Sequence, residues 1–248
     1  MLARKTLSSL VTNNEKIEKY ERYALYYLPS ENSVLADLGR DWFGYDIYCQ
    51  GLLKRPNTFG LSSVFLDRIT ELVKRYSLHA TLKAPFYLND GYTLDMLKDR
   101  LKRFCQNRYS FEIEPLDLQQ HNSTLRFSLP KKSEKIDQLA SQCMLAFDEF
   151  RAPLSVAERT RRLDEALTLH QRLMLEAYGY PYVLSEFQFH MNLTSQLKDE
   201  DLEIARVGLA PLMQKITSIP LKIGAISLVG DPGANQPFHL IETFLFAN

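Results

Sequence analysis

The sequence predicts an α+β domain made of two similar halves, and three observations support this. First, 45% hydrophobic and 24% charged residues are typical of a globular protein. Second, segments with the alternation of a strand are interspersed with segments that have helical spacing. Third, the order strand, helix, strand, strand occurs twice, on either side of a helical stretch, without a low-complexity linker. We therefore expect an N-terminal lead-in (1–19) and a single domain (20–248), with lobe 1 at about 20–130, a helical insertion at about 131–180 and lobe 2 at about 181–248.

The first half begins with RYALYYL, an aromatic-rich segment that Pro29 closes and that predicts a strand. Helical spacing on either side of LHATLKAPFYL predicts two helices that flank a second strand. FEIEPLDL and TLRFSLP then predict a pair of strands separated by the polar stretch QQHNS. The expected elements are a strand at 22–28, a helix at 61–76, a strand at 78–88, a helix at 91–107 and strands at 111–118 and 124–130.

The second half begins with the helical insertion, which a break at 151–153 divides in two. Ser155 and Glu158 have the spacing of a capping box and predict that a second helix begins there. Gly179 and Pro181 predict its end. The expected elements are helices at 133–150 and 155–178, a strand at 186–197, a helix at 199–216 and strands at 220–230 and 238–246.

Charge and cysteine content restrict the kinds of partner. The 30 basic and 30 acidic residues cancel, so no global field attracts a long nucleic acid or an anionic membrane, and any anion site must be local. No apolar run reaches the length of about 20 residues that a membrane span requires, and the N-terminus lacks the pattern of a secretory signal. Three widely spaced cysteines are interpreted as free thiols. We expect a cytoplasmic protein that binds neither membranes nor long nucleic acids.

Two predicted strands each carry a histidine on a polar face. Side chains alternate along a strand, so each segment presents one apolar face and one polar face. The polar faces are His79, Thr81 and Lys83 on the first strand, and Gln188, His190, Asn192 and Thr194 on the second.

If the two polar faces line one cleft, they can perform acid/base chemistry on a phosphoester. One imidazole, with an ordinary pKa near ~6.5, can take a proton from the attacking oxygen while the other gives one to the leaving oxygen, so neither metal nor cofactor is required. Thr81 and Asn192 can donate hydrogen bonds to phosphate oxygens, and Lys83 can offset the developing charge.

A structural role is the usual explanation for a single histidine on a strand. Two histidines on matched faces favour function instead, whereas His121, His170 and His239 have no matched partner and are interpreted as structural. Trp42 and Phe43 are interpreted as core residues rather than a platform for base stacking.

At the histidine strands, the sequence resembles the two-histidine (2H) phosphoesterase superfamily, whose hallmark is a pair of His-x-Thr/Ser strand motifs. His79 and His190 lie 111 positions apart. The segments RYALYYLP, GRDWFGYD, LHATLKAPF, FRAPLS with the RR that follows, GYPYVLSEFQFHMNLT and DPGANQPFHL are similar to the bacterial branch named for phosphonate metabolism. Together these motifs extend over about residues 20–246.

The resemblance implies a bilobal fold, with two pseudo-symmetric antiparallel-sheet lobes and flanking helices around a central cleft. It implies that both histidines act as acid and base, without a metal, on a small cyclic or nucleotide-like phosphodiester, in a function linked to phosphonate metabolism. We also expect Tyr26, Arg126 and Arg151 near the cleft, with Arg151 as an anion clamp, because a guanidinium binds phosphate in a bidentate manner.

The second motif departs from the family pattern at one position. Asn192 stands where the pattern has Thr or Ser; its amide can still donate a hydrogen bond, but with a different reach. Thr194, on the same face, is a further candidate ligand residue, two strand residues farther along and ~7 Å away. The departure leaves an alternative open, a non-catalytic module that binds a phosphorylated ligand or an RNA end.

Overall fold

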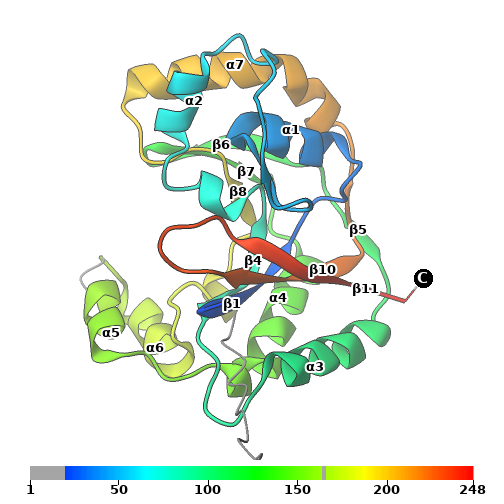
Figure 1. Cartoon of the computed structure of the whole chain (residues 1–248), viewed down its shortest axis with the longest axis vertical. Coiled ribbons are helices and arrows are strands. Elements are labelled where there is room, and N and C mark those ends of the chain that lie inside the picture. Colours follow the sequence, from blue (N-terminus) through cyan, green and yellow to red (C-terminus); the bar gives the residue numbers. More distant parts are fainter. Residues whose placement is uncertain (1–19, 164–165, 248) are drawn as a thin grey trace, which may run out of the picture.

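Two antiparallel sheets form the centre of the molecule in the computed structural model, which describes residues 20–163 and 166–247 (Figure 1). The predicted lead-in at 1–19 lies outside the described residues. The larger sheet has the strand order β11-β10-β1-β4 and the smaller one the order β6-β7-β8, so the α+β prediction is confirmed. The strands of the larger sheet are β1 (Arg22–Tyr27), β4 (Ala80–Phe86), β10 (Ala225–Asp231) and β11 (His239–Leu245); those of the smaller sheet are β6 (Asp117–His121), β7 (Thr124–Ser128) and β8 (His190–Asn192).

Each sheet combines strands from both halves of the chain. In the larger sheet β1 pairs with β10, which follows it by about two hundred residues, and Leu25 faces Leu228. In the smaller sheet β8 joins the hairpin of β6 and β7. Two short pairs, β2 (Tyr45–Asp46) with β3 (Gly51–Leu52) and β5 (Phe111–Ile113) with β9 (Leu221–Ile223), complete the strands. The sheets therefore do not follow the lobe boundaries predicted along the sequence.

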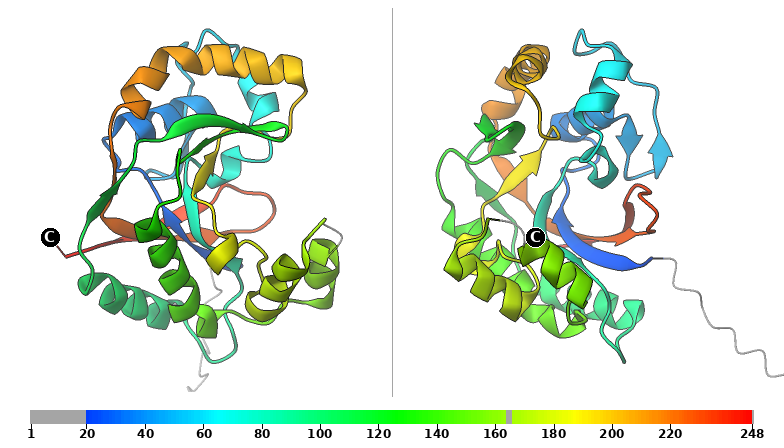
Figure 2. Two further views of the ribbon diagram at one scale, coloured as in Figure 1. Left: turned by 180° about the vertical axis from the view of Figure 1, so that it is seen from behind. Right: turned by 90° about the vertical axis from the view of Figure 1, so that its left-hand side faces the viewer.

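Helices cover the two sheets on opposite ends of the molecule (Figures 1 and 2). One group packs around the smaller sheet, where α7 contacts β7 and α1; the other lies under the larger sheet, where α4 contacts β4 and α3 contacts β11. A third group, made of α5 and α6, projects at the side of the molecule. The helices are α1 (Val34–Phe43), α2 (Ser63–Ile69), α3 (Leu94–Gln106), α4 (Glu134–Ala146), α5 (Val156–Leu163), α6 (Leu169–Tyr178) and α7 (Asp199–Thr217), with 3-10 turns at Lys74–Tyr76, Asp148–Phe150 and Leu184–Glu186.

The helical insertion is more divided than predicted: α4 ends at Ala146, before a 3-10 turn at Asp148–Phe150, and the second helix is also interrupted. The Ser155–Glu158 capping box is present, since each residue's backbone N–H lies 3.2 Å from the other's side-chain oxygen. The helix predicted over 155–178 is, however, two helices, because Thr168 and Gln171 form a second capping box that begins α6. A capping box of this kind starts a new helix even where apolar residues continue at helical spacing through it.

The core confirms the interpretation of the aromatic pair at the end of α1. Trp42 and Phe43 are buried, and the Trp42 indole N–H donates to the Leu193 carbonyl at 2.8 Å. Cys105 and Cys143 are buried thiols and Cys49 is exposed. Within the described ranges, the helices are all too short or too polar to cross a bilayer.

Candidate active site

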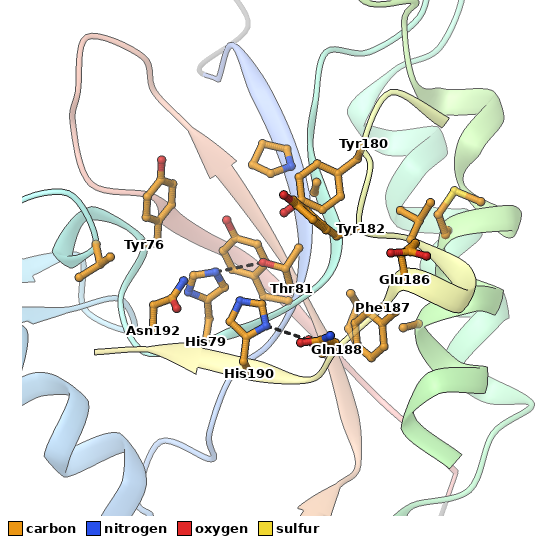
Figure 3. Close-up of a pocket in the computed structure, with 18 of the residues that line it drawn as sticks. Tyr76, His79, Thr81, Tyr180, Tyr182, Glu186, Phe187, Gln188, His190 and Asn192 are labelled. Carbon is orange, nitrogen blue, oxygen red and sulfur yellow. Dashed lines mark hydrogen bonds between the residues drawn. The ribbon is translucent and has the colours of Figure 1, made fainter. Parts of the chain in front are cut away.

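A cavity of about 950 Å³ lies between the two sheets, and both predicted histidines line it. His79 immediately precedes β4 and His190 begins β8. β4 ends the larger sheet, β8 ends the smaller sheet, and the two strands contact each other (Figure 2). Figure 3 shows the rings of His79 and His190 next to each other in the cavity. The fold thus joins two sequence motifs that are distant along the chain.

Strand alternation explains how these side chains reach the cavity. Leu78 and Ala80 are buried in the core, whereas His79 between them lines the cavity. On β8 the side chain of Met191 is completely buried, and its neighbours His190 and Asn192 line the cavity. Thr81 also lines it, so the structure brings the first two polar positions of each motif together.

Both imidazoles are held by the same local hydrogen bond. His79 Nδ1 lies 3.1 Å from the Ser77 carbonyl, and His190 Nδ1 lies 2.8 Å from the Gln188 carbonyl, in each case two residues earlier. Because a carbonyl can only accept, Nδ1 carries the proton and Nε2 of a neutral ring keeps its lone pair. The Thr81 hydroxyl lies 3.2 Å from His79 Nε2 and can donate to it. Each histidine therefore has a basic nitrogen available for proton transfer.

The surroundings of His79 keep its ring neutral. The imidazole stacks on Tyr26, with ring centroids 3.9 Å apart and an interplanar angle of 27°. Burial is the main reason that the pKa of His79 is lowered to about 4; the hydrogen bond to Ser77 opposes the shift and His190 adds to it. At neutral pH the ring can therefore accept a proton.

His190 is shifted in the same direction. Burial lowers its pKa, the hydrogen bond to Gln188 opposes this, and Arg126 and His121 add to it. A phosphate anion next to either ring would raise its pKa again, because an opposite charge favours the imidazolium. Binding of an anionic ligand can therefore protonate one of the two imidazole rings, both of which are neutral in the free protein.

Lys83 was predicted on the histidine face, but the structure places it elsewhere. Thr81 pairs with Tyr26 and Lys83 pairs with Leu25, so Leu82 is an extra residue on β4, a β-bulge. A bulge reverses the alternation beyond it. The Lys83 side chain is 4% exposed, does not line the cavity, and its Nζ lies 3.2 Å from Asp148 Oδ1.

Two further predicted ligand residues also lie outside the cavity. Thr194 follows the end of β8, is buried, and its hydroxyl accepts from the Leu125 N–H at 2.9 Å. Arg151 pairs with Asp148, with Nε 2.9 Å from Oδ1, and donates to the Ala177 carbonyl at 3.2 Å. Both side chains therefore tie segments of the fold together instead of facing the cavity.

Arg126 and Tyr26, by contrast, line the cavity as expected. Arg126 is opposite Asn192 in the pairing of β7 with β8, and its Nη2 lies 3.4 Å from Gln188 Oε1. Its Nε is buried and has no hydrogen-bond partner among the described residues. This guanidinium next to His190 thus keeps donor capacity for a ligand.

Several cavity residues were not found by sequence reasoning. His121, interpreted as structural, is at the end of β6 and lines the cavity. In the sequence, Arg161 and Arg162 stand out only as part of a motif shared with the family. The other residues missed include Arg22, Arg75, Tyr76, Tyr180, Tyr182 and Glu186. Isolated arginines and tyrosines carry no periodic signal, so only the fold could group them.

The cavity is positively charged although the chain is neutral. Five arginines line it, and Glu186 is the single acidic residue found among the described lining residues. Two of the arginines, Arg22 and Arg75, both pair with Asp231, whose carboxylate offsets part of their charge. The remaining positive charge makes the cavity suitable for an anion. Across residues 20–163 and 166–247, no three His, Cys, Asp or Glu side chains form a group that could hold a metal ion.

Fold and site together define the protein as an α+β protein with a cationic cavity and one histidine at the start of each of two edge strands. The chain belongs to the family described as "Protein of unknown function (DUF1045)", which it matches over residues 81–239.

Two curated relatives are named ribose 1,5-bisphosphate phosphokinase PhnN. The protein from Janthinobacterium sp. (strain Marseille) is 29% identical over 225 residues, which are 89% of this chain and 50% of the relative. The protein from Laribacter hongkongensis (strain HLHK9) is 29% identical over 183 residues, which are 73% of this chain and 42% of the relative. The chain thus spans about half the length of the curated relatives that it matches.

Similar solved structures include LigT from E. coli complexed with 3'-AMP, with 12% identity and a TM-score of 0.44 over 92% of this chain and 98% of LigT. Another is a phosphoesterase, with 11% identity and a TM-score of 0.41 over 92% of this chain and 99% of that chain.

Proposed function

We propose that this chain is a metal-independent phosphodiesterase of the two-histidine type, which opens a small cyclic or nucleotide-like phosphodiester. The observation that carries the proposal is the matched pair of histidines. Each has Nδ1 bound to the carbonyl two residues earlier, and both line a single cationic cavity. Such a pair can take a proton on one side of a phosphorus atom and give one on the other side.

The proposed reaction needs one neutral and one charged imidazole. The neutral ring takes a proton from water at Nε2 while the water oxygen forms a bond to phosphorus; the bond from phosphorus to the leaving oxygen breaks, and the imidazolium gives that oxygen a proton. The substrate's negative charge raises the histidine pKa values on binding and so supplies the imidazolium. Arg126 and the amide of Asn192 would donate to the phosphate oxygens as charge develops on them.

The names of the relatives suggest a substrate class. They refer to a ribose bisphosphate, so we include cyclic ribose phosphates among the candidate substrates. We do not extend the kinase activity to this chain, because its sequence contains no Gly-x4-Gly-Lys-Ser/Thr phosphate-binding loop. A role connected with phosphonate metabolism is part of the proposal and rests on the motifs.

The decisive experiment measures turnover of 2',3'-cyclic nucleotides and cyclic ribose phosphates in the presence of a chelator. His79→Ala and His190→Ala should each lower the rate by roughly 10² to 10⁴. His170→Ala is the matched control, because this exposed histidine bonds to Ser185 and does not line the cavity. Turnover that depends on added divalent metal, or that survives both alanine substitutions, would refute the proposal.

A second candidate is a module that binds a phosphorylated ligand without converting it. Asn192 favours this candidate, because it replaces the hydroxyl residue of the family pattern in the cavity wall. Thermal unfolding with each candidate substrate separates the two functions: a binding module is stabilised by the ligand while no product appears.

A further inference from the structure

The short helix α5 contributes to the cavity but not to the core. None of its residues is buried, and it carries three arginines, Arg159, Arg161 and Arg162. Arg161 and Arg162, at the C-terminal end of α5, line the cavity, whereas Arg159 does not. Burial of apolar side chains in the core therefore does not explain the position of α5. The arginines that it contributes to the cavity suggest a different role for this helix.

The three arginines differ in their partners. Arg159 is neutralised by Glu176, with Nη2 2.7 Å from Oε1. Arg161 and Arg162 form no ion pair with any residue in the part of the chain that the structure describes. The Nε of Arg162 is buried and has no hydrogen-bond partner there. A buried guanidinium N–H without a partner is costly unless a ligand or water accepts from it.

The position of this pair separates it from the histidines. The guanidinium carbon of Arg162 lies 5.2 Å from the ring centroid of Tyr180. Figure 3 shows Tyr180 and Tyr182 apart from the rings of His79 and His190, with Thr81 drawn between them. The cavity, of about 950 Å³, is much larger than a single phosphate requires and is as large as sites for drug-sized ligands. It therefore has room for a ligand that extends from the histidines to α5.

We propose that Arg161 and Arg162 form a second anion subsite, which binds a phosphate monoester group on the same molecule as the phosphodiester held by the histidines. Arginine suits this role because its planar guanidinium binds phosphate oxygens in a bidentate manner. The identity of the substrate as a compound with two phosphates rests on the proposed function. The subsite itself does not, since it can be tested by binding alone.

The binding test uses inorganic phosphate, titrated calorimetrically at low ionic strength into the full chain. The parent should bind two phosphates, and Arg161→Gln/Arg162→Gln should weaken one of these sites at least about tenfold. Arg159→Gln, on the same helix but outside the cavity, should keep both. A single site in the parent, or two sites of unchanged affinity in the double variant, would overturn the subsite whether or not the chain has phosphodiesterase activity.

The kinetic test compares adenosine 2',3'-cyclic phosphate with the same compound carrying a 5'-phosphate. The parent should prefer the 5'-phosphorylated compound by at least about tenfold in kcat/KM, and the double variant should lose this preference while it still turns over the unphosphorylated compound. Equal kcat/KM for both compounds in the parent, together with two bound phosphates, would refute the use of the subsite by substrate. Absence of turnover with both compounds would contradict the proposed function and leave the binding result to decide the subsite.

Discussion

The pKa of His79 predicts a specific dependence of stability on pH, which the substitution His79→Gln tests. Glutamine keeps a polar side chain at this position and does not titrate. In the unfolded chain the histidine binds a proton below its ordinary pKa of about 6.5. In the folded protein burial lowers the pKa to about 4. Between these values the unfolded state binds more protons, so the free energy of unfolding falls as the pH is lowered from about 6.5 to about 4.

The size of the effect follows from the two pKa values. From pH 7 to pH 5, His79 alone should lower the free energy of unfolding by about 2 kcal/mol, and from pH 7 to pH 4 by about 3 kcal/mol. His79→Gln should lack this part of the pH dependence. The contacts that glutamine fails to replace act at every pH, so they cancel when each variant is compared with itself at two pH values.

The assay is urea unfolding at pH 7 and pH 5, without phosphate in the buffer because a bound anion would raise the histidine pKa. His170→Gln, at an exposed histidine, is the matched control and should behave like the parent. If the parent and His79→Gln lose the same free energy of unfolding between the two pH values, then the ring is not buried in its neutral form and the argument for a neutral base at pH 7 fails.

Three further substitutions test the assignments of individual residues. Asn192→Thr should preserve or raise kcat/KM, whereas Asn192→Ala should lower it roughly ten- to a hundredfold, because a phosphate oxygen loses its donor; equal rates in all three proteins would exclude contact with phosphate. Lys83→Met should leave kcat/KM unchanged, because Nζ binds Asp148 outside the cavity; a loss of about tenfold or more would return Lys83 to the site. Thr194→Val should lower the free energy of urea unfolding by about 1–3 kcal/mol more than Thr194→Ser does, because valine removes the acceptor of the Leu125 N–H whereas serine keeps it and loses only a buried methyl group. Equal losses in both variants would show that this hydrogen bond contributes nothing.

Local patterns in the sequence were sufficient to predict that both histidines face away from the core, on the side where the structure has the cavity. The alternation of apolar and polar residues placed Leu78 and Met191 in the core, and His79 and His190 on the opposite faces. This succeeded because alternation along a strand depends only on backbone geometry, which nearest neighbours set. The capping box at Ser155 was predictable for the same reason, since both of its hydrogen bonds join residues three apart.

Only the tertiary structure decided which strands pair and where their alternation is interrupted. A bulge at Leu82, set by the pairing of β4 with β1, turned Lys83 away from the cavity. The pairing of β1 with β10 drew strands from both halves into one sheet. The packing of α5 against the cavity brought Arg161 and Arg162 to a site whose histidines lie on other elements. Periodicity records which face of a segment is buried, but it contains no information on the partner that buries it. The histidines could therefore be predicted from the chain, whereas the arginines that line the same cavity became a group only when the sheets and the insertion were assembled.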